Sequence, residues 1–319
     1  ECNGNRARIW VIAHCIIKNG LVVKEWLVRD NQGLYEQLGV CPDTVANKWA
    51  KNWFEEYQIC KLSHHAWLES EYQRVTETGN HVANLDLNNV FPVSRREMYD
   101  YLGKYIVGKY KSLWGKEGMS SRSEFCKMLR SIYHPHARYD SCQGHDVVGY
   151  TELENLYDTF VLGGNKGEDV ALAIDWVILK PGESTREGNH EAKNVWRYPS
   201  SEDISMQTDF FAKFKDAASA AETFTMAIRW TLVGKQKQAS GPSLPVVLLA
   251  ESHVQCAGFR IIQDTTVYDG VALSAQLKLG KQLQQLEDSR SACSANLEHA
   301  KSHTLEADLV AVEIETPYS

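Results

Sequence analysis

The sequence contains no apolar run of the ~18 residues that a membrane-spanning helix requires. Even residues 9–17, the stretch IWVIAHCII, are interrupted by His14. An excess of positive charge is also absent, because 34 Lys and Arg residues face 41 Asp and Glu residues and the formal net charge is −7. Binding to the phosphates of nucleic acids requires a basic surface. We therefore expect a soluble protein that binds neither membranes nor nucleic acids.

The eight cysteines are far apart, with no CxxC pair and no cluster of Cys and His at zinc spacing. His134, His136 and His145 lie close together in the sequence, but no carboxylate at a suitable spacing completes a metal site. We expect these histidines at the surface or at the rim of a pocket, and we predict neither a metal nor an organic cofactor. The chain opens at Glu1 without a signal segment, which favours free thiols in the reducing cytoplasm. The lack of an initiator Met there suggests that the start is missing.

The order of the helical and strand patterns favours an α+β fold. The chain has 319 residues and 43% apolar content, enough to fill a substantial core. Apolar residues at helical spacing come first, in residues 98–114, 121–133 and 152–162. Stretches rich in β-branched and aromatic residues follow, in residues 170–179, 224–233, 245–254 and 260–268. The segment 180–221 separates the first two predicted strands, and we interpret it as an insertion.

An internal repeat relates residues 14–38 to residues 253–277 without a gap. Six pairs are identical: His14/His253, Val28/Val267, Asp30/Asp269, Leu34/Leu273, Gln37/Gln276 and Leu38/Leu277. Both copies fit a strand, a turn, a second strand and a helix. The first copy is preceded by only 13 residues, so it comprises only the last hairpin and helix of a domain. Either the chain is a fragment, or this hairpin completes a sheet that something else supplies, because an unpaired apolar hairpin leaves an exposed sheet edge.

The repeat carries a family resemblance. The run VVKEWLVRDNQGLYEQLGV (22–40) resembles the closing strand and helix of SnoaL-like proteins, the polyketide and ester cyclase branch of the NTF2-like superfamily, and especially those with tandem domains. Residues 132–163, AIRWTLVGKQ (227–236), AESHV (250–254) and TVYDGVALSAQL (266–277) are similar to successive parts of the same domain. The resemblance implies a cone, in which a curved mixed sheet and helices enclose a pocket for an apolar small molecule. It also implies a homodimer formed through the open sheet face.

The predicted domain boundaries follow from the two copies. Residues 1–45 form the C-terminal part of a first SnoaL-like domain, and 46–94 form a helical linker. Residues 95–277 form a complete second domain that contains the insertion 180–221. Residues 278–319 form a C-terminal helix and tail.

The family's aldol-type cyclases place an acidic residue three positions before the Asp that aligns with Asp269 and Asp30. Thr266 and Leu27 occupy those positions here, and neither side chain can act as a general acid or base near neutral pH. Asp269 and Asp30 themselves are better explained as helix N-caps. The remaining candidates for acid and base catalysis are His253, Asp264 and Asp140.

Each candidate has a structural alternative. His253 is expected to point into the pocket, but it could equally be a core histidine that a neighbour satisfies. Asp264 lies within a predicted strand, where a carboxylate is costly unless it is paired or faces a wet cavity. The predicted ligand-binding residues are Tyr139, Trp230, Thr266, His14 and Trp26.

Two functions remain open at this point. The first is binding of a small apolar, polyketide-like molecule with proton transfer or ring closure at a carbonyl compound. The second is a non-catalytic ligand-binding or assembly module on the same scaffold, because a fold does not dictate a function.

Overall fold

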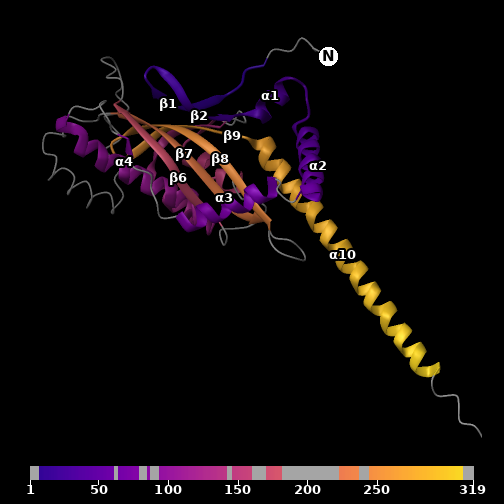
Figure 1. Ribbon diagram of the computed structural model, residues 1–319. Coiled ribbons are helices and arrows are strands. Elements are labelled where there is room, and N and C mark those ends of the chain that lie inside the picture. Colours follow the sequence, from indigo (N-terminus) through magenta and orange to yellow (C-terminus); the bar gives the residue numbers. More distant parts are fainter. Residues whose placement is uncertain are drawn as a thin grey trace, which may run out of the picture.

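In the computed structural model, a seven-stranded sheet curves around one long helix, α4 (Val93–Trp114) (Figure 1). The residues that the structure describes are 7–60, 64–78, 85–86, 93–141, 146–159, 170–181, 223–236 and 244–311. The predicted α+β class is confirmed. Apart from residues 180 and 181, the predicted insertion 180–221 lies outside the described residues.

The sheet has the strand order β3-β6-β7-β8-β9-β4-β5. Its strands are β3 (Leu85–Asp86), β4 (Tyr133–Ser141), β5 (Asp146–Val148), β6 (Ala171–Pro181), β7 (Thr223–Gln236), β8 (Leu244–Ala257) and β9 (Arg260–Tyr268). The pairs β3/β6 and β4/β9 are parallel, whereas the other four pairs are antiparallel. All four strands predicted from composition are present within a few residues of their expected bounds. The short strand β3 falls in the segment that was expected to be only helical.

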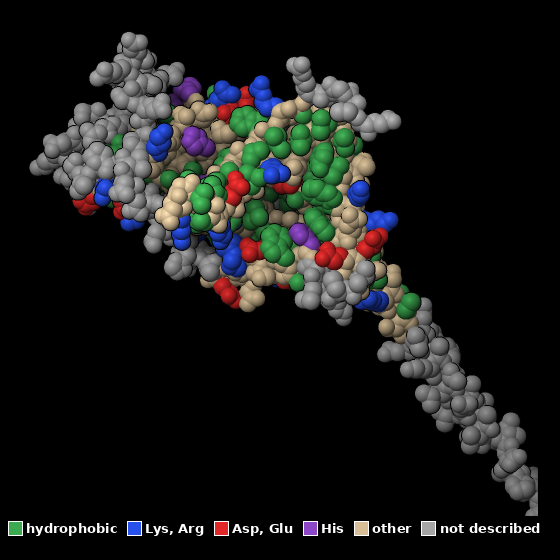
Figure 2. Space-filling model, turned by 45° about the horizontal axis from the view of Figure 1, so that its top comes forward, with side chains coloured by type: hydrophobic (Ala, Val, Ile, Leu, Met, Phe, Trp, Pro, Cys, Tyr) green, Lys and Arg blue, Asp and Glu red, His purple; other side chains and the backbone are tan. Residues whose placement is uncertain are grey.

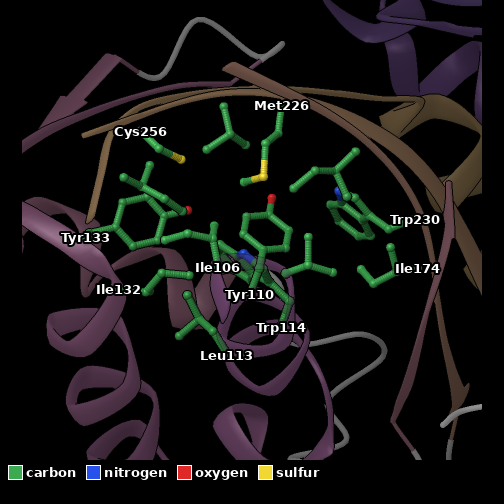
Figure 3. Packing of buried hydrophobic residues seen from close by; sticks show 14 of the residues in the cluster. Ile106, Tyr110, Leu113, Trp114, Ile132, Tyr133, Ile174, Met226, Trp230 and Cys256 are labelled. Atoms are coloured by element: carbon green, nitrogen blue, oxygen red, sulfur yellow. The ribbon is translucent and has the colours of Figure 1, made fainter. Parts of the chain in front are cut away.

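Helices fill the concave face of the sheet. Besides α4, they are α5 (Lys116–Met119), α6 (Arg122–Ile132), α7 (Tyr150–Leu153) and α8 (Leu156–Thr159). The side chain of Ser121 caps α6 by accepting a hydrogen bond from the Glu124 amide. Figure 3 shows Tyr110 and Trp114 of α4 pointing toward the inner face of the sheet, where they pack among its buried apolar side chains. The buried apolar side chains of α4 and of the inner face of the sheet form one close-packed core.

The convex face is covered by the first part of the same chain. The hairpin β1 (Val11–Lys18) and β2 (Leu21–Arg29) lies over the sheet, followed by α1 (Asn31–Gln37), α2 (Pro42–Cys60) and α3 (His64–Thr78) (Figure 1). In α3, Leu68 and Val75 pack on Val247 and its neighbours on the outer face of the sheet. The first turns of α10 (Gly270–Ala311) pack against α2, and the helix then extends away from the sheet. The open face expected to form a homodimer is therefore largely occupied within this chain.

The two repeated hairpins have the same strand pairing. Val11 pairs with Arg29 as Ala250 pairs with Tyr268, and each hairpin has an irregularity at the same place, between Ile16 and Ile17 or between Gln255 and Cys256. Each ends at an Asp that caps the next helix: Asp30 accepts from the Gly33 amide at 2.8 Å, and Asp269 accepts from the Ala272 amide at 3.0 Å. Both aspartates are N-caps, as the sequence predicts.

None of the helices formed by the described residues combines the length and the apolar character needed to cross a bilayer.

Candidate functional site

A buried carboxyl group, Asp264, lies on the concave side of strand β9, between β8 and β4 in the sheet. Its side chain is fully buried. The hydroxyl of Tyr133, at the start of β4, donates to Asp264 Oδ2 at 2.6 Å, and Thr266 Oγ1 donates to Oδ1 at 2.9 Å. Because Asp264 and Thr266 are two residues apart on one strand, they face the same side of the sheet. The carboxyl group is thus held by hydroxyl groups from two adjacent strands.

A chain of hydrogen bonds extends from Thr266 across the sheet. Ser252 Oγ lies 2.6 Å from Thr266 Oγ1, and both Tyr110 OH and Trp230 Nε1 lie 2.9 Å from Ser252 Oγ. An indole N–H can only donate, and an ionised carboxylate can only accept. With Thr266 donating to an ionised Asp264, Ser252 therefore donates to Thr266 and accepts from Tyr110 and Trp230. All donors in the network then point toward the carboxylate.

Burial raises the pKa of Asp264 from its ordinary value of 3.8 to about 6, although the hydrogen bonds from Tyr133 and Thr266 favour the ionised form. Burial also raises the pKa of the Tyr110 and Tyr133 hydroxyls well above 10, and the charge of Asp264 adds to this effect. The tyrosines are therefore neutral donors at physiological pH. Asp264, in contrast, can gain or lose a proton near neutrality.

Tyr139 contributes a further hydroxyl group beside the carboxyl group. It pairs with Asp264 across strands β4 and β9, and its side chain is buried. Burial and the charge of Asp264 raise the pKa of this phenol well above 10, so it stays protonated. Among the described residues, the Tyr139 hydroxyl makes no hydrogen bond of normal geometry, although Thr266 lies near enough to oppose part of the rise in its pKa. A buried donor without a partner costs free energy unless another polar group, such as a ligand oxygen, accepts from it.

This arrangement is suited to proton transfer on an apolar molecule. A carboxyl group with a pKa near the working pH can remove a proton and return it. A neutral phenol beside it can donate a hydrogen bond to an oxygen on which negative charge develops. The described residues contain no group of three or more His, Cys, Asp or Glu side chains that could hold a metal ion.

A second polar cluster lies between the hairpin and the convex face. His14 Nδ1 is 3.5 Å from Glu251 Oε1, and both side chains are buried. Burial raises the pKa of Glu251 to about 7, opposed by the charge of Arg229, and burial together with that charge lowers the pKa of His14. Arg229 lies over the ring of Trp26 at 4.9 Å. This cluster is separated from Asp264 by the thickness of the sheet.

A small pocket of about 250 Å³ also lies on the convex side. Val247, Leu248 and Leu249 of β8 contribute to its lining, together with Trp53 and His64, whose rings stack at 3.8 Å. Burial lowers the pKa of His64 to about 4, so the ring is neutral at physiological pH. The lining of this pocket is mostly apolar and does not include Asp264.

Four of the predicted site residues come together at the concave face: Asp264, Thr266, Trp230 and Tyr139. The other four do not. His253 is exposed on the convex side, because it alternates with the inward-facing Ser252, so the expectation that it points into the pocket is wrong.

Asp140 is also displaced from the acid. It alternates with the inward-facing Tyr139, and its carboxylate binds Arg138 Nε at 2.6 Å and Gln263 Nε2 at 3.1 Å. His14 and Trp26 belong to the convex cluster beneath the hairpin and not to the concave interior.

Sequence reasoning missed three members of the network: Tyr110, Tyr133 and Ser252. Ser252 could have been found, because it shares one face of the predicted strand with Ala250 and Val254. Tyr133 and Tyr110 are 131 and 142 residues from their partners, and no local pattern connects them.

No family model and no curated protein matches the sequence. Solved structures do resemble the chain. A protein with a ketosteroid isomerase-like fold from Catenulispora acidiphila, in complex with trimethylamine, is 12% identical, and the match covers 54% of this chain and 90% of that one with a TM-score of 0.30. A candidate SnoaL-like polyketide cyclase from Shewanella putrefaciens is 11% identical, covering 56% and 96% of the two chains with a TM-score of 0.31.

A candidate polyketide cyclase from Streptomyces antibioticus is 13% identical, covering 55% of this chain and 97% of that chain with a TM-score of 0.30. The SnoaL-like family to which the sequence motifs are similar is thus represented among these structures. Likenesses of this size say nothing about substrate or reaction, which must be inferred from the residues of this chain.

Proposed function

We propose that this protein binds a small apolar carbonyl compound at the concave face and transfers a proton at the carbon next to the carbonyl group. The observation that carries the proposal is the pairing of a fully buried carboxyl group, Asp264, with the partnerless hydroxyl of Tyr139 on the neighbouring strand. Asp264 is the catalytic acid and base, and Tyr139 donates to the carbonyl oxygen. The apolar side chains of the core exclude water and favour an apolar ligand.

The carboxyl group needs to be ionised to act as a base. Its pKa of about 6 leaves most molecules ionised at pH 7.5 while keeping the conjugate acid strong enough to return the proton. Tyr133 and Thr266 orient the two carboxyl oxygens and are positioning residues. The free thiols of the described cysteines Cys15, Cys41, Cys126, Cys256 and Cys293 agree with the cytoplasmic location that we propose for the protein.

The second candidate function is binding or assembly without catalysis. It is favoured by the packing at the concave face, where Tyr110 and Trp114 are buried against the network and both oxygens of Asp264 already have donors. A ligand can reach the acid only if these aromatic side chains shift. In this alternative the polar network specifies the packing of α4 on the sheet.

Deuterium exchange at the carbon next to a ketone distinguishes the two functions. We expect the protein to accelerate exchange of 2-tetralone in D2O, followed by NMR, and expect Asp264→Asn to lose roughly 10²-fold or more of that rate. Tyr139→Phe should reduce the rate while leaving the pH at half-maximal rate near 6. Asp158→Asn is the matched control, because it removes a carboxylate that is exposed and pairs with Arg122 at the surface.

Exchange that survives Asp264→Asn would refute the proposed base. Exchange that is absent from the wild type, while 2-tetralone binding is still detected by NMR line broadening and lost in Tyr139→Phe, would favour the non-catalytic alternative.

A further inference from the structure

The hairpin β1–β2 presents an apolar face to solvent. Val11, Ile17, Val22 and Leu27 are 42%, 64%, 58% and 38% exposed, respectively. Figure 2 shows apolar side chains, in green, gathered on the face of the molecule that is turned toward the viewer. The opposite face of the hairpin, which includes His14, is packed on the convex face of the sheet. The exposed face therefore belongs to a two-stranded sheet that is covered on only one side.

The internal repeat shows what covers this face in a complete copy. Cross-strand pairs on the exposed face are Val11/Arg29, Ala13/Leu27, Cys15/Glu25 and Ile17/Val22, and their equivalents in the second copy are Ala250/Tyr268, Ser252/Thr266, Val254/Asp264 and Cys256/Ile261. All eight residues of the second copy are buried. There the concave face is covered by α4. The hairpin thus exposes the surface that lies under an aromatic helix in the complete cone.

The outer edge of β1, which pairs with no other strand in the described part of the chain, has an equally defined counterpart. Strand β1 corresponds to β8, whose other edge pairs in antiparallel fashion with β7 along its whole length. Transferred to β1, this register places the apolar β7 side chains beside the exposed ones: Phe224 beside Ile17, Met226 beside Cys15, Ile228 beside Ala13 and Trp230 beside Val11. An edge strand with a matching apolar face is a site for strand addition.

We infer that the hairpin is an acceptor site for a polypeptide partner that adds an antiparallel strand to β1, with apolar residues at every second position, and lays an aromatic amphipathic helix over the exposed face. Its occupant is a strand of the β7 type, bound in the register that β7 and β8 share. The inference rests on the repeated register, on the shared irregularity after Ile16 and Gln255, and on the exposed apolar side chains.

Such a partner would also bury an acid. Glu25 occupies the position equivalent to Asp264, and Leu27 the position equivalent to Thr266. Cys15 Sγ lies 3.8 Å from Glu25 Oε1 on this face. A partner helix would therefore enclose a second carboxyl group in a cone that lacks the Thr hydroxyl of the first.

A synthetic peptide with the sequence of residues 223–236, TFTMAIRWTLVGKQ, tests the acceptor site. With the peptide in excess over the intact protein, we expect hydrogen exchange at the amides of residues 11–17 to slow at least tenfold. The double variant Ile17→Glu/Val22→Glu should abolish this protection, and both positions are exposed, so the fold should tolerate the change. Val148→Glu is the matched control, because Val148 is 53% exposed on the edge strand β5 of the large sheet.

The inference is overturned if residues 11–17 gain no protection, or if the double variant and Val148→Glu affect protection equally. It is also overturned if light scattering finds a mass of twice 36.1 kDa that the double variant halves, because a second copy would then occupy the face. A peptide of the same composition in scrambled order should give no protection.

Discussion

Replacing Asp264 with Asn should change how stability depends on pH, and the size of the change follows from the burial of the carboxyl group. A pKa of 3.8 in the unfolded chain and about 6 in the folded protein corresponds to about 3 kcal/mol. Below pH 3.8 the group is protonated in both states and costs nothing. Between pH 3.8 and 6 the unfolded chain loses the proton first, so stability falls as pH rises. Above pH 6 the full cost is present.

The asparagine variant has no such proton, so its stability lacks this part of the pH dependence. Asn retains one oxygen acceptor and the volume of the side chain, and losing one acceptor for Tyr133 or Thr266 adds a cost that does not vary with pH. We therefore expect the free energy of unfolding of the variant minus that of the wild type to increase by about 2.5 kcal/mol from pH 4 to pH 8.

Urea unfolding at half-unit pH steps measures this difference directly. Other buried groups, Glu251 among them, contribute equally to both proteins and cancel. Asp158→Asn controls for the loss of one negative charge, because Asp158 is exposed and pairs with Arg122 at the surface. A difference that stays constant within about 0.5 kcal/mol across this pH range would refute the assignment of Asp264 as a group that titrates near neutrality.

Three further predictions concern single contacts. Tyr133→Phe removes the 2.6 Å hydrogen bond to Asp264, so the pKa of that carboxyl should rise further, seen as a shift of the same stability profile to higher pH. Glu251→Gln should stabilise the protein more at pH 8 than at pH 4.5, because ionising the buried carboxyl group, whose pKa is raised to about 7, costs stability as the pH rises from 4.5 to 7. Urea unfolding at the two pH values measures this, and an equal effect at both would contradict it. Asp30→Ala should cost about 1 kcal/mol through loss of the helix cap. Thermal melts of the two variants should show a larger loss of stability for Asp269→Ala than for Asp30→Ala, since Asp269 also accepts from Asn31 at 2.5 Å. A larger loss for Asp30→Ala would show that this second hydrogen bond contributes nothing.

The class of the fold could be predicted because its strands are dense in β-branched residues and its repeat has no gap. The order of strand, turn, strand and helix in each repeat and the two Asp caps follow from local pattern alone, and residues 260–268 form a strand with the predicted bounds. Local pattern could not decide which face of a strand is inside. Both faces of β8 carry buried residues, Glu251 on one face and Ser252 and Val254 on the other, so the pattern around His253 does not reveal its orientation.

The site was only partly predictable for a related reason. Asp264 is recognisable because a carboxylate inside an apolar strand demands partners. Its partner Tyr133 comes from a strand that pairs with β9 in parallel, across a separation of 131 residues. Only the folded topology brings the two side chains together.

A single extra residue determines which chemistry of β9 faces inward. In the β8–β9 register Ile261 pairs with Cys256 and Gln263 with Gln255, so Ile262 is looped out between them. As a result Ile261 and Asp264 face the same side although they are three positions apart. If Ile262 instead continued the regular pleat, the alternation counted from Ile261 would turn the amide of Gln263 inward and the acid outward. The acidity of the interior is therefore a matter of phase along the strand, and it depends on Ile262 being looped out of the pleat.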